Sequence, residues 1–202
     1  MSSTSNLAAS ERIKEIQARV GAAPDGRWGK KSQAALVAHM DGILNKHNFF
    51  NIPDTNKEVI ERYGHPNDAN FAKTFLTNID VSSLENLYYL GKTKVTKIRC
   101  HVYIRKLLLG FLKELDSHPT HKLLLREYAG CYNHRNSRVG NILSDHAWGI
   151  AIDLAPKRNK LRAHWPLEAE MPLEVYEIAA KYGATSLGWQ ANYDAMHITW
   201  RR

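Results

Sequence analysis

The 202-residue sequence has no long hydrophobic run, no low-complexity tract and only two cysteines. Because no stretch approaches the roughly 20 apolar residues that cross a bilayer, we expect no stable membrane insertion. Residues 1–17 lack an apolar core behind an early basic cluster, so they do not resemble a signal peptide. We therefore expect a protein that is made in the cytoplasm and stays there unless something else releases it.

The two cysteines, Cys100 and Cys131, are too few and too far apart for a disulfide framework or a CxxC metal site. Free cysteine is among the most often buried residues, so we expect two small buried thiols. A single bridge between them is the alternative, because spacing in the sequence cannot establish it.

The net charge of +8 is unevenly distributed. Residues 87–140 contain eleven basic and three acidic residues, whereas the segments before and after are each balanced. Such a basic region suggests an anionic partner: nucleic acid, anionic lipid or a cell-wall polymer. A solvated face without a dedicated partner is an equal alternative. Since the region contains no nucleic-acid-binding motif, we expect no nucleic-acid partner.

Periodicity and turn residues predict helices and strands that interleave along the chain. We expect a disordered lead-in over residues 1–9 and helices over 10–20, 30–45, 57–63, 71–76, 102–115 and 172–182. Strands are predicted over 93–99, 123–128, 149–154 and 196–200. Because these elements lack a βαβ rhythm, the sequence favours an α+β fold with an antiparallel sheet and flanking helices.

A histidine and an aspartate lie seven residues apart between Ser144 and Asp153, separated by small and apolar residues. In a straight strand, His146 and Asp153 would be about 23 Å apart, with side chains on opposite faces. They can therefore share an ion only if the chain turns between them, and Gly149 is the natural hinge. Asp153 would then project from a buried strand, where a carboxylate needs a cation or a set of donors.

A second pair, Asp194 and His197, lies in an apolar frame near the C-terminus. A catalytic zinc takes three protein ligands and leaves one position open for water. His146, Asp153 and His197 supply two imidazoles and a carboxylate. Asp194, three residues before a ligand, is well placed to accept a proton from that water. A lone histidine among apolar residues is usually a core residue, and spacing alone leaves this alternative open.

Family motifs strengthen the zinc hypothesis. The pattern Ser144-x-His146-x-x-Gly149-x-Ala151-x-Asp153, followed by Asp194-x-x-His197, resembles the zinc D-alanyl-D-alanine carboxypeptidase and L-alanyl-D-glutamate endopeptidase family. That family shares its fold with the hedgehog signalling domain. The resemblance extends upstream through Val95–His101 and Gly130–Arg135, and it looks closest to phage lysin-type members.

The resemblance implies one zinc ion per chain, with His146, Asp153 and His197 as ligands and Asp194 as the catalytic base. It also implies an arginine near the substrate, and either Arg135 or Arg138 can fill this role. The function implied is a monomeric endolysin that cuts the L-alanyl-D-glutamate bond of bacterial peptidoglycan after release to the cell wall. The alternatives are a D-alanyl-D-alanine carboxypeptidase and a non-catalytic wall-binding protein.

The first part of the chain resembles the helical peptidoglycan-binding repeat that is attached to many cell-wall hydrolases. The resemblance is carried by Ile13-x-x-Ile16-Gln17, Val20-Gly21, Asp25-Gly26-x-Trp28-Gly29 and Ser32-x-x-Ala35-Leu36. It implies two parts, a wall-binding segment over residues 1–48 and a zinc peptidase domain over residues 49–202. A plain helical hairpin that packs on the main domain is the alternative.

Overall fold

Helices and short antiparallel strand pairs alternate in the computed structural model, which describes residues 3–138 and 142–202. The α-helices are α1 (Ser3–Arg19), α2 (Lys30–Lys46), α3 (Asn56–Tyr63), α4 (Phe71–Phe75), α5 (Arg105–Ser117), α6 (Leu173–Lys181) and α7 (Leu187–Ala191). Two 3₁₀ helices are η1 (His121–Glu127) and η2 (Asp145–Trp148). The strands are β1 (Leu76–Asp80), β2 (Tyr88–Tyr89), β3 (Thr93–Lys94), β4 (Lys97–His101), β5 (Ala151–Asp153) and β6 (His197–Thr199).

The strands of the described ranges form three separate two-stranded sheets, β1–β4, β2–β3 and β5–β6. Every pair is antiparallel. The predicted α+β class with antiparallel pairing is therefore confirmed, although the strands do not join into one sheet. No helix in this part of the chain is long and apolar enough to cross a membrane.

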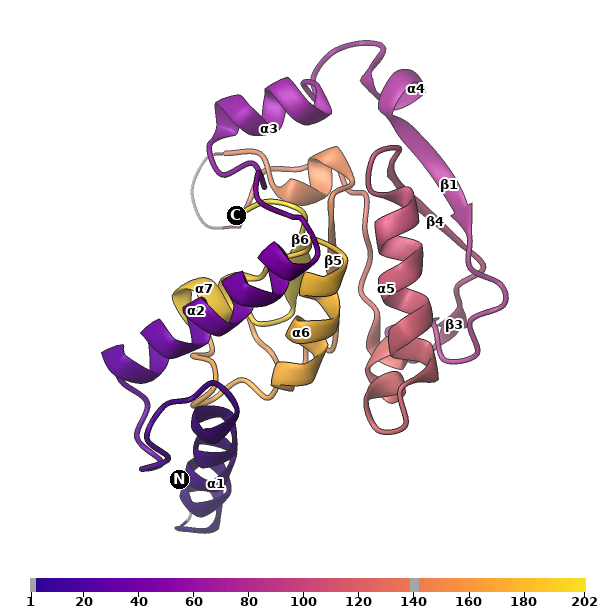
Figure 1. The fold of residues 1–202 in the computed structure, drawn as a ribbon. Coiled ribbons are helices and arrows are strands. Elements are labelled where there is room, and N and C mark those ends of the chain that lie inside the picture. Colours follow the sequence, from indigo (N-terminus) through magenta and orange to yellow (C-terminus); the bar gives the residue numbers. More distant parts are fainter. Residues whose placement is uncertain (1–2, 139–141) are drawn as a thin grey trace.

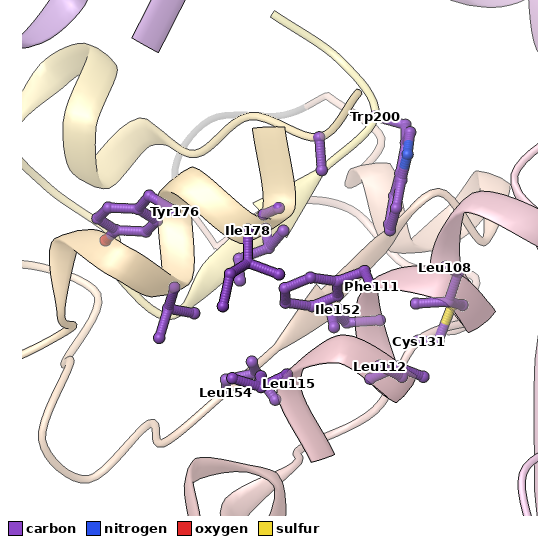
Figure 2. Close-up of a cluster of buried hydrophobic side chains, with 14 of the residues drawn as sticks. Leu108, Phe111, Leu112, Leu115, Cys131, Ile152, Leu154, Tyr176, Ile178 and Trp200 are labelled. Carbon is purple, nitrogen blue, oxygen red and sulfur yellow. The ribbon is translucent and has the colours of Figure 1, made fainter. Parts of the chain in front are cut away.

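The core lies where α5, α6 and the β5–β6 pair meet. On α5, Leu108, Phe111, Leu112 and Leu115 are all buried, and their spacing places them on one face of the helix. Figure 2 shows this face packed together with residues of β5 and α6. In Figure 1, α5 stands between α6 and the β1–β4 pair, and it contacts both. Helix α5 thus packs against both parts of the molecule, which also meet directly where the N–H of His101 donates to the carbonyl of Gly149 over 3.0 Å.

Three predicted elements differ in the structure. The strand predicted over residues 93–99 is divided between β3 and β4, which belong to different sheets. Residues 123–128 are not a strand, because η1 covers most of them. A short run of leucines does not distinguish a strand from a buried helical turn. Helix α1 begins at Ser3, so residues 3–9 are not a disordered lead-in and the first helix does not begin at residue 10. Leu7, Ala8 and Ala9 have high helix propensity, so the helix continues from Ser10 towards the N-terminus. Residues 1 and 2 of the predicted lead-in lie outside the described residues.

Strand β1 was not predicted, because only helices, over residues 57–63 and 71–76, were expected in this region. Strand β1 pairs with β4 over five residues, from Leu76 opposite His101 to Asp80 opposite Lys97. The predicted buried thiols are confirmed, since Cys100 on β4 and Cys131 are both free and buried.

A single buried glutamine organises the N-terminal helical hairpin. Gln17 on α1 donates from Nε2 to Asp25 Oδ1 over 2.8 Å and to Ser32 Oγ over 2.9 Å. Its Oε1 accepts from the backbone N–H of Gly26 over 2.9 Å. One side chain therefore connects α1, the Asp-Gly turn and the start of α2.

This hairpin contacts the rest of the chain through α6 and α7. Arg19 donates from Nε and Nη2 to the carboxylate of Glu177 on α6, over 2.8 and 2.6 Å. Trp28 packs edge-to-face on Trp165, with ring centroids 5.7 Å apart. Figure 1 shows α2 lying across α6 and α7, and contacts of α2 with both helices agree with this view. The division of the chain at residue 48 stays a prediction.

Candidate metal centre

A left-handed turn at Gly149 allows His146 and Asp153 to approach each other. Helix η2 ends at Gly149, which has φ 69° and ψ 29° and donates its N–H to the carbonyl of His146 over 3.0 Å. The chain then continues into β5, which ends at Asp153. A Cβ atom at position 149 would lie 3.1 Å from the backbone N of His101. Both the conformation and the close approach therefore favour glycine at the predicted hinge.

Strand pairing adds the third member of the group. Strands β5 and β6 pair with Asp153 directly opposite His197. His197 Nδ1 lies 3.1 Å from Asp153 Oδ1, and His146 Nε2 lies 3.2 Å from Asp153 Oδ2. The possible ligand atoms of the three residues all lie within 4.8 Å of one another. The structure thus brings together the three side chains that the sequence predicted as metal ligands.

The hydrogen bonds of His146 suit a metal ligand. Its Nδ1 lies 2.6 Å from the carbonyl oxygen of Cys131, so Nδ1 carries the proton that it donates. In the neutral ring, Nε2 then carries the lone pair. This buried nitrogen has no hydrogen-bond partner among the described residues, although it lies 3.2 Å from Asp153. A lone pair that faces a carboxylate is repelled unless a proton or a metal cation lies between them. Two imidazoles and a carboxylate this close together form a donor set that fits zinc.

Asp153 and His197 have strongly shifted pKa values. Burial raises the pKa of Asp153, but its contacts with His146 and His197 outweigh burial and hold the pKa well below the usual range. Burial lowers the pKa of His197, but contacts with Asp145 and Asp153 outweigh it and raise the pKa to about 10. The surroundings of Asp153 therefore favour positive charge.

Asp194 lies in the same cleft but outside the group of three possible ligands. Its backbone is left-handed, with φ 54°, and its carbonyl accepts from the N–H of His197 over 3.0 Å. Within the described ranges, its buried Oδ1 has no hydrogen-bond partner. Burial raises the pKa of Asp194, and a higher pKa makes its carboxylate a stronger base.

The cleft around these groups has a volume of about 290 Å³, and both predicted arginines line it. Arg135 is half-buried, and its Nη1 donates to the carbonyl of Asn136 over 3.1 Å. The charge of Arg135 also acts on Asp194, whose pKa it lowers against the larger effect of burial. Arg138 is exposed. The structure thus places both arginines at the cleft. The charge of Arg135 interacts with Asp194, the predicted base.

One residue of this centre, Asp145, was not predicted from the sequence. Its Oδ2 lies 3.5 Å from His197 Nε2. Burial raises the pKa of Asp145, but its contacts with His197 and Arg201 lower it overall. The available signal was an acidic residue directly before a predicted ligand, His146. That signal is weak, because the partner of Asp145, His197, lies in a distant segment, and the sequence does not show which distant groups meet.

A second group of possible metal ligands, His118, His121 and Glu174, is not part of this cleft. His118 Nδ1 accepts from the backbone N–H groups of Thr120 and His121, over 3.3 and 3.1 Å. The neutral ring therefore carries its proton on Nε2, which cannot then bind a metal. Glu174 also accepts from Arg19 over 2.8 Å. This group is better explained as a hydrogen-bond network.

One comparison with known proteins gave a match. A family model described as D-alanyl-D-alanine carboxypeptidase matches residues 137–200, about a third of the chain. The matched segment contains His146, Asp153, Asp194 and His197. No curated protein and no solved structure matches the chain. The match supports assignment to this peptidase family.

Proposed function

We propose that the protein is a zinc-dependent peptidase that hydrolyses the bond between L-alanine and D-glutamate in the stem peptides of bacterial peptidoglycan. The observation that carries the proposal is the geometry of His146, whose unpaired Nε2 lies 3.2 Å from the Asp153 carboxylate. The half-buried Asp194 in the same cleft adds a group that a purely structural metal site does not need. The family match supports peptide-bond hydrolysis.

When bound by His146, Asp153 and His197, zinc would supply positive charge that makes a water molecule more acidic and polarises a peptide carbonyl. The Asp194 carboxylate accepts the proton of the attacking water and then gives it to the leaving amine. One water and one peptide bond are consumed, and a carboxylate and an amine are formed. Asp194 ends in the state in which it began. Because water itself attacks the peptide carbonyl, no covalent intermediate with the protein is needed.

Arg135 is the better candidate for binding the substrate. Its half-buried guanidinium lies in the cleft, and its charge acts on Asp194. A guanidinium can bind a substrate carboxylate through two parallel hydrogen bonds, and the stem peptide carries a carboxylate on D-glutamate. Arg138 also lines the cleft, but its side chain is exposed.

We assign the peptidase the role of an endolysin, a phage-encoded bacteriolytic enzyme that acts on the cell wall after release. A cut between L-alanine and D-glutamate separates a crosslinked stem from its glycan strand. Removal of a terminal D-alanine, in contrast, leaves existing crosslinks intact. The excess of basic residues over 87–140 would attract the protein to an anionic cell envelope.

The description of the matching family model favours a second candidate, a D-alanyl-D-alanine carboxypeptidase. The two functions share the metal centre and differ only in which peptide bond lies over it. A non-catalytic wall-binding protein is less consistent with the cleft, because it has no use for Asp194 as a base.

The products of one digestion separate these candidates. The purified protein is incubated with a defined muropeptide, and the new amino terminus is identified by mass spectrometry. We expect a new D-glutamate amine. Release of free D-alanine with the rest of the stem intact would identify the carboxypeptidase, and an unchanged muropeptide would favour the binding protein.

A further inference from the structure

The imidazole of His197 lies between two carboxylates. Its Nδ1 is 3.1 Å from Asp153 Oδ1, on the side of the three possible metal ligands. Its Nε2 is 3.5 Å from Asp145 Oδ2, on the opposite side of the ring. His197 is buried, so its orientation is set by these protein groups.

We propose that Asp145 is a positioning residue, which holds His197 in the orientation that presents Nδ1 to the metal. The inference rests on the proposed zinc centre. It adds a role for a residue outside the ligand set, since Asp145 is not in the group of possible ligands found among the described residues.

The Asp145 carboxylate is itself held in place by β6 and by the residues that follow it. Thr199 Oγ1 donates to Asp145 Oδ2 over 2.9 Å, and Arg201 Nη1 lies 3.4 Å from Asp145 Oδ1. Thr199 follows His197 by two residues in β6, so both side chains lie on the same face of the strand. The carboxylate therefore bridges two neighbours on one strand face.

The same short helix supplies a ligand and the group that orients another ligand. Asp145 and His146 are consecutive residues of η2. His146 is oriented by the Cys131 carbonyl, and His197 is oriented by Asp145. A histidine ligand keeps its orientation and tautomer when its other nitrogen donates to a carbonyl or carboxylate. The Cys131 carbonyl accepts from His146, and Asp145 is the carboxylate within ion-pair distance of His197 Nε2.

A purely structural role for Asp145 predicts different behaviour. In that case its partners would be Thr199 and Arg201 alone, and its loss would loosen the C-terminal segment without a specific effect on the metal. Arg201→Gln removes the cation from this cluster but keeps Thr199, which holds the Asp145 oxygen that faces His197. Asp80→Asn makes a matched loss of charge at an exposed aspartate that contacts Ser82.

The experiment measures zinc affinity by chelator competition for the full-length wild type, Asp145→Ala, Asp145→Asn and the two controls. Loss of an outer carboxylate of this kind lowers metal affinity by about 10- to 100-fold, so we expect a loss in that range for Asp145→Ala. Asp145→Asn should lose less, because its amide oxygen still accepts one hydrogen bond. Both controls should bind zinc nearly as tightly as the wild type.

The second readout is nuclear magnetic resonance of histidine-labelled, zinc-loaded protein, which reports the protonated ring nitrogen of His197. We expect the proton on Nε2 in the wild type, with faster exchange or a change of nitrogen in Asp145→Ala. Equal affinity and an unchanged His197 signal in Asp145→Ala would overturn the inference. If that variant does not fold, equal affinity of Asp145→Asn and the wild type overturns it. A wild type that binds no zinc would instead overturn the proposed function.

Discussion

Two aspartates of the cleft have pKa values shifted in opposite directions. Asp153 contacts two imidazoles, which hold its pKa low in spite of burial. Asp194 is half-buried, its buried Oδ1 has no partner among the described residues, and burial raises its pKa. Opposite shifts in neighbouring carboxyl groups are typical of sites where the two groups have different roles. Here the shifts agree with Asp153 as a ligand and Asp194 as a base.

Asp194 and the ligands should therefore respond differently to substitution. Asp194→Asn should keep the fold and the zinc but lower the rate of cleavage by about 100-fold or more, because an amide cannot accept the proton. Asparagine suits this position, since it tolerates the left-handed backbone that Asp194 adopts. Zinc content and the rate of stem-peptide cleavage are the measurements.

His197→Ala is the contrast to this variant, because it should lose the metal together with activity. Equal zinc loss in the two variants would show that Asp194 is a ligand and would contradict its assignment as the base.

At the scale of elements, the turn between η2 and β5 carries the geometry of the centre. Gly149 has a left-handed backbone, and a Cβ atom there would lie 3.1 to 3.3 Å from the backbone of His101, the backbone of Cys100 and the side chain of Leu76. Such contacts are tight, and backbone atoms of a paired strand cannot move aside easily. The glycine is therefore needed for both its conformation and its size.

Gly149→Ala should lower the free energy of unfolding by about 2–3 kcal/mol, since conformational strain and steric contact add. It should also weaken zinc binding, because His146 and Asp153 lie on either side of the turn. Urea denaturation and chelator competition measure the two effects.

Gly21→Ala is the matched control for this prediction. Gly21 is also left-handed, with φ 76°, but nothing lies within 4 Å of its Cβ position. The substitution should cost about 1 kcal/mol from conformation alone and leave zinc affinity unchanged. Equal destabilisation by the two substitutions would mean that the contacts around Gly149 relax without cost.

For the whole molecule, zinc binding should be coupled to stability. A ligand at 100 times its dissociation constant stabilises the folded state by about 2.7 kcal/mol, which in a chain of this size raises Tm by about 5–10 °C. Chelation should remove this gain and abolish activity, and added zinc should restore both. Asp194→Asn should show the same rise in Tm. A fully active preparation free of metal would contradict the zinc mechanism.

The N-terminal hairpin shares its apolar core with the rest of the molecule. Leu36, Met40 and Leu44 on α2 are fully buried, within one cluster that includes residues of α5 and α6. Burial of each such side chain contributes about 1.5–3 kcal/mol. Deletion of residues 1–48 would therefore destabilise the remaining chain, so surface substitutions test wall binding more cleanly.

If the hairpin binds the wall, the double substitution Ala34→Glu and Ala38→Glu should weaken sedimentation with purified peptidoglycan. Both alanines are exposed and line a groove on α2 with Trp28 and Val37. Cleavage of small soluble stem peptides should be unaffected, because that groove lies outside the catalytic cleft.

Lys57→Glu is the control for this pair, since it makes the same change in net charge at an exposed position of α3. Equal sedimentation of the two variants would favour the plain hairpin over a wall-binding segment.

Patterns in the sequence over a few neighbouring residues were sufficient to predict several helices and the turn at the metal centre. Helical periodicity predicted α2, α5 and α6 to within three residues at each end, and the glycine between His146 and Asp153 predicted the turn. The possible ligands were predictable because each lies in a short motif with its own spacing. These features are encoded within about ten residues of chain, where backbone preferences act directly.

Tertiary contacts decided the rest. Residues 121–127 form a 3₁₀ helix against α5, although their leucines suit a strand equally well. Asp145 meets His197 only because η2 packs beside the β5–β6 pair. The sequence by itself determined which side chains can bind a metal. Their orientation was decided by contacts between segments some 50 residues apart, because spacing along the chain does not specify which distant groups will meet.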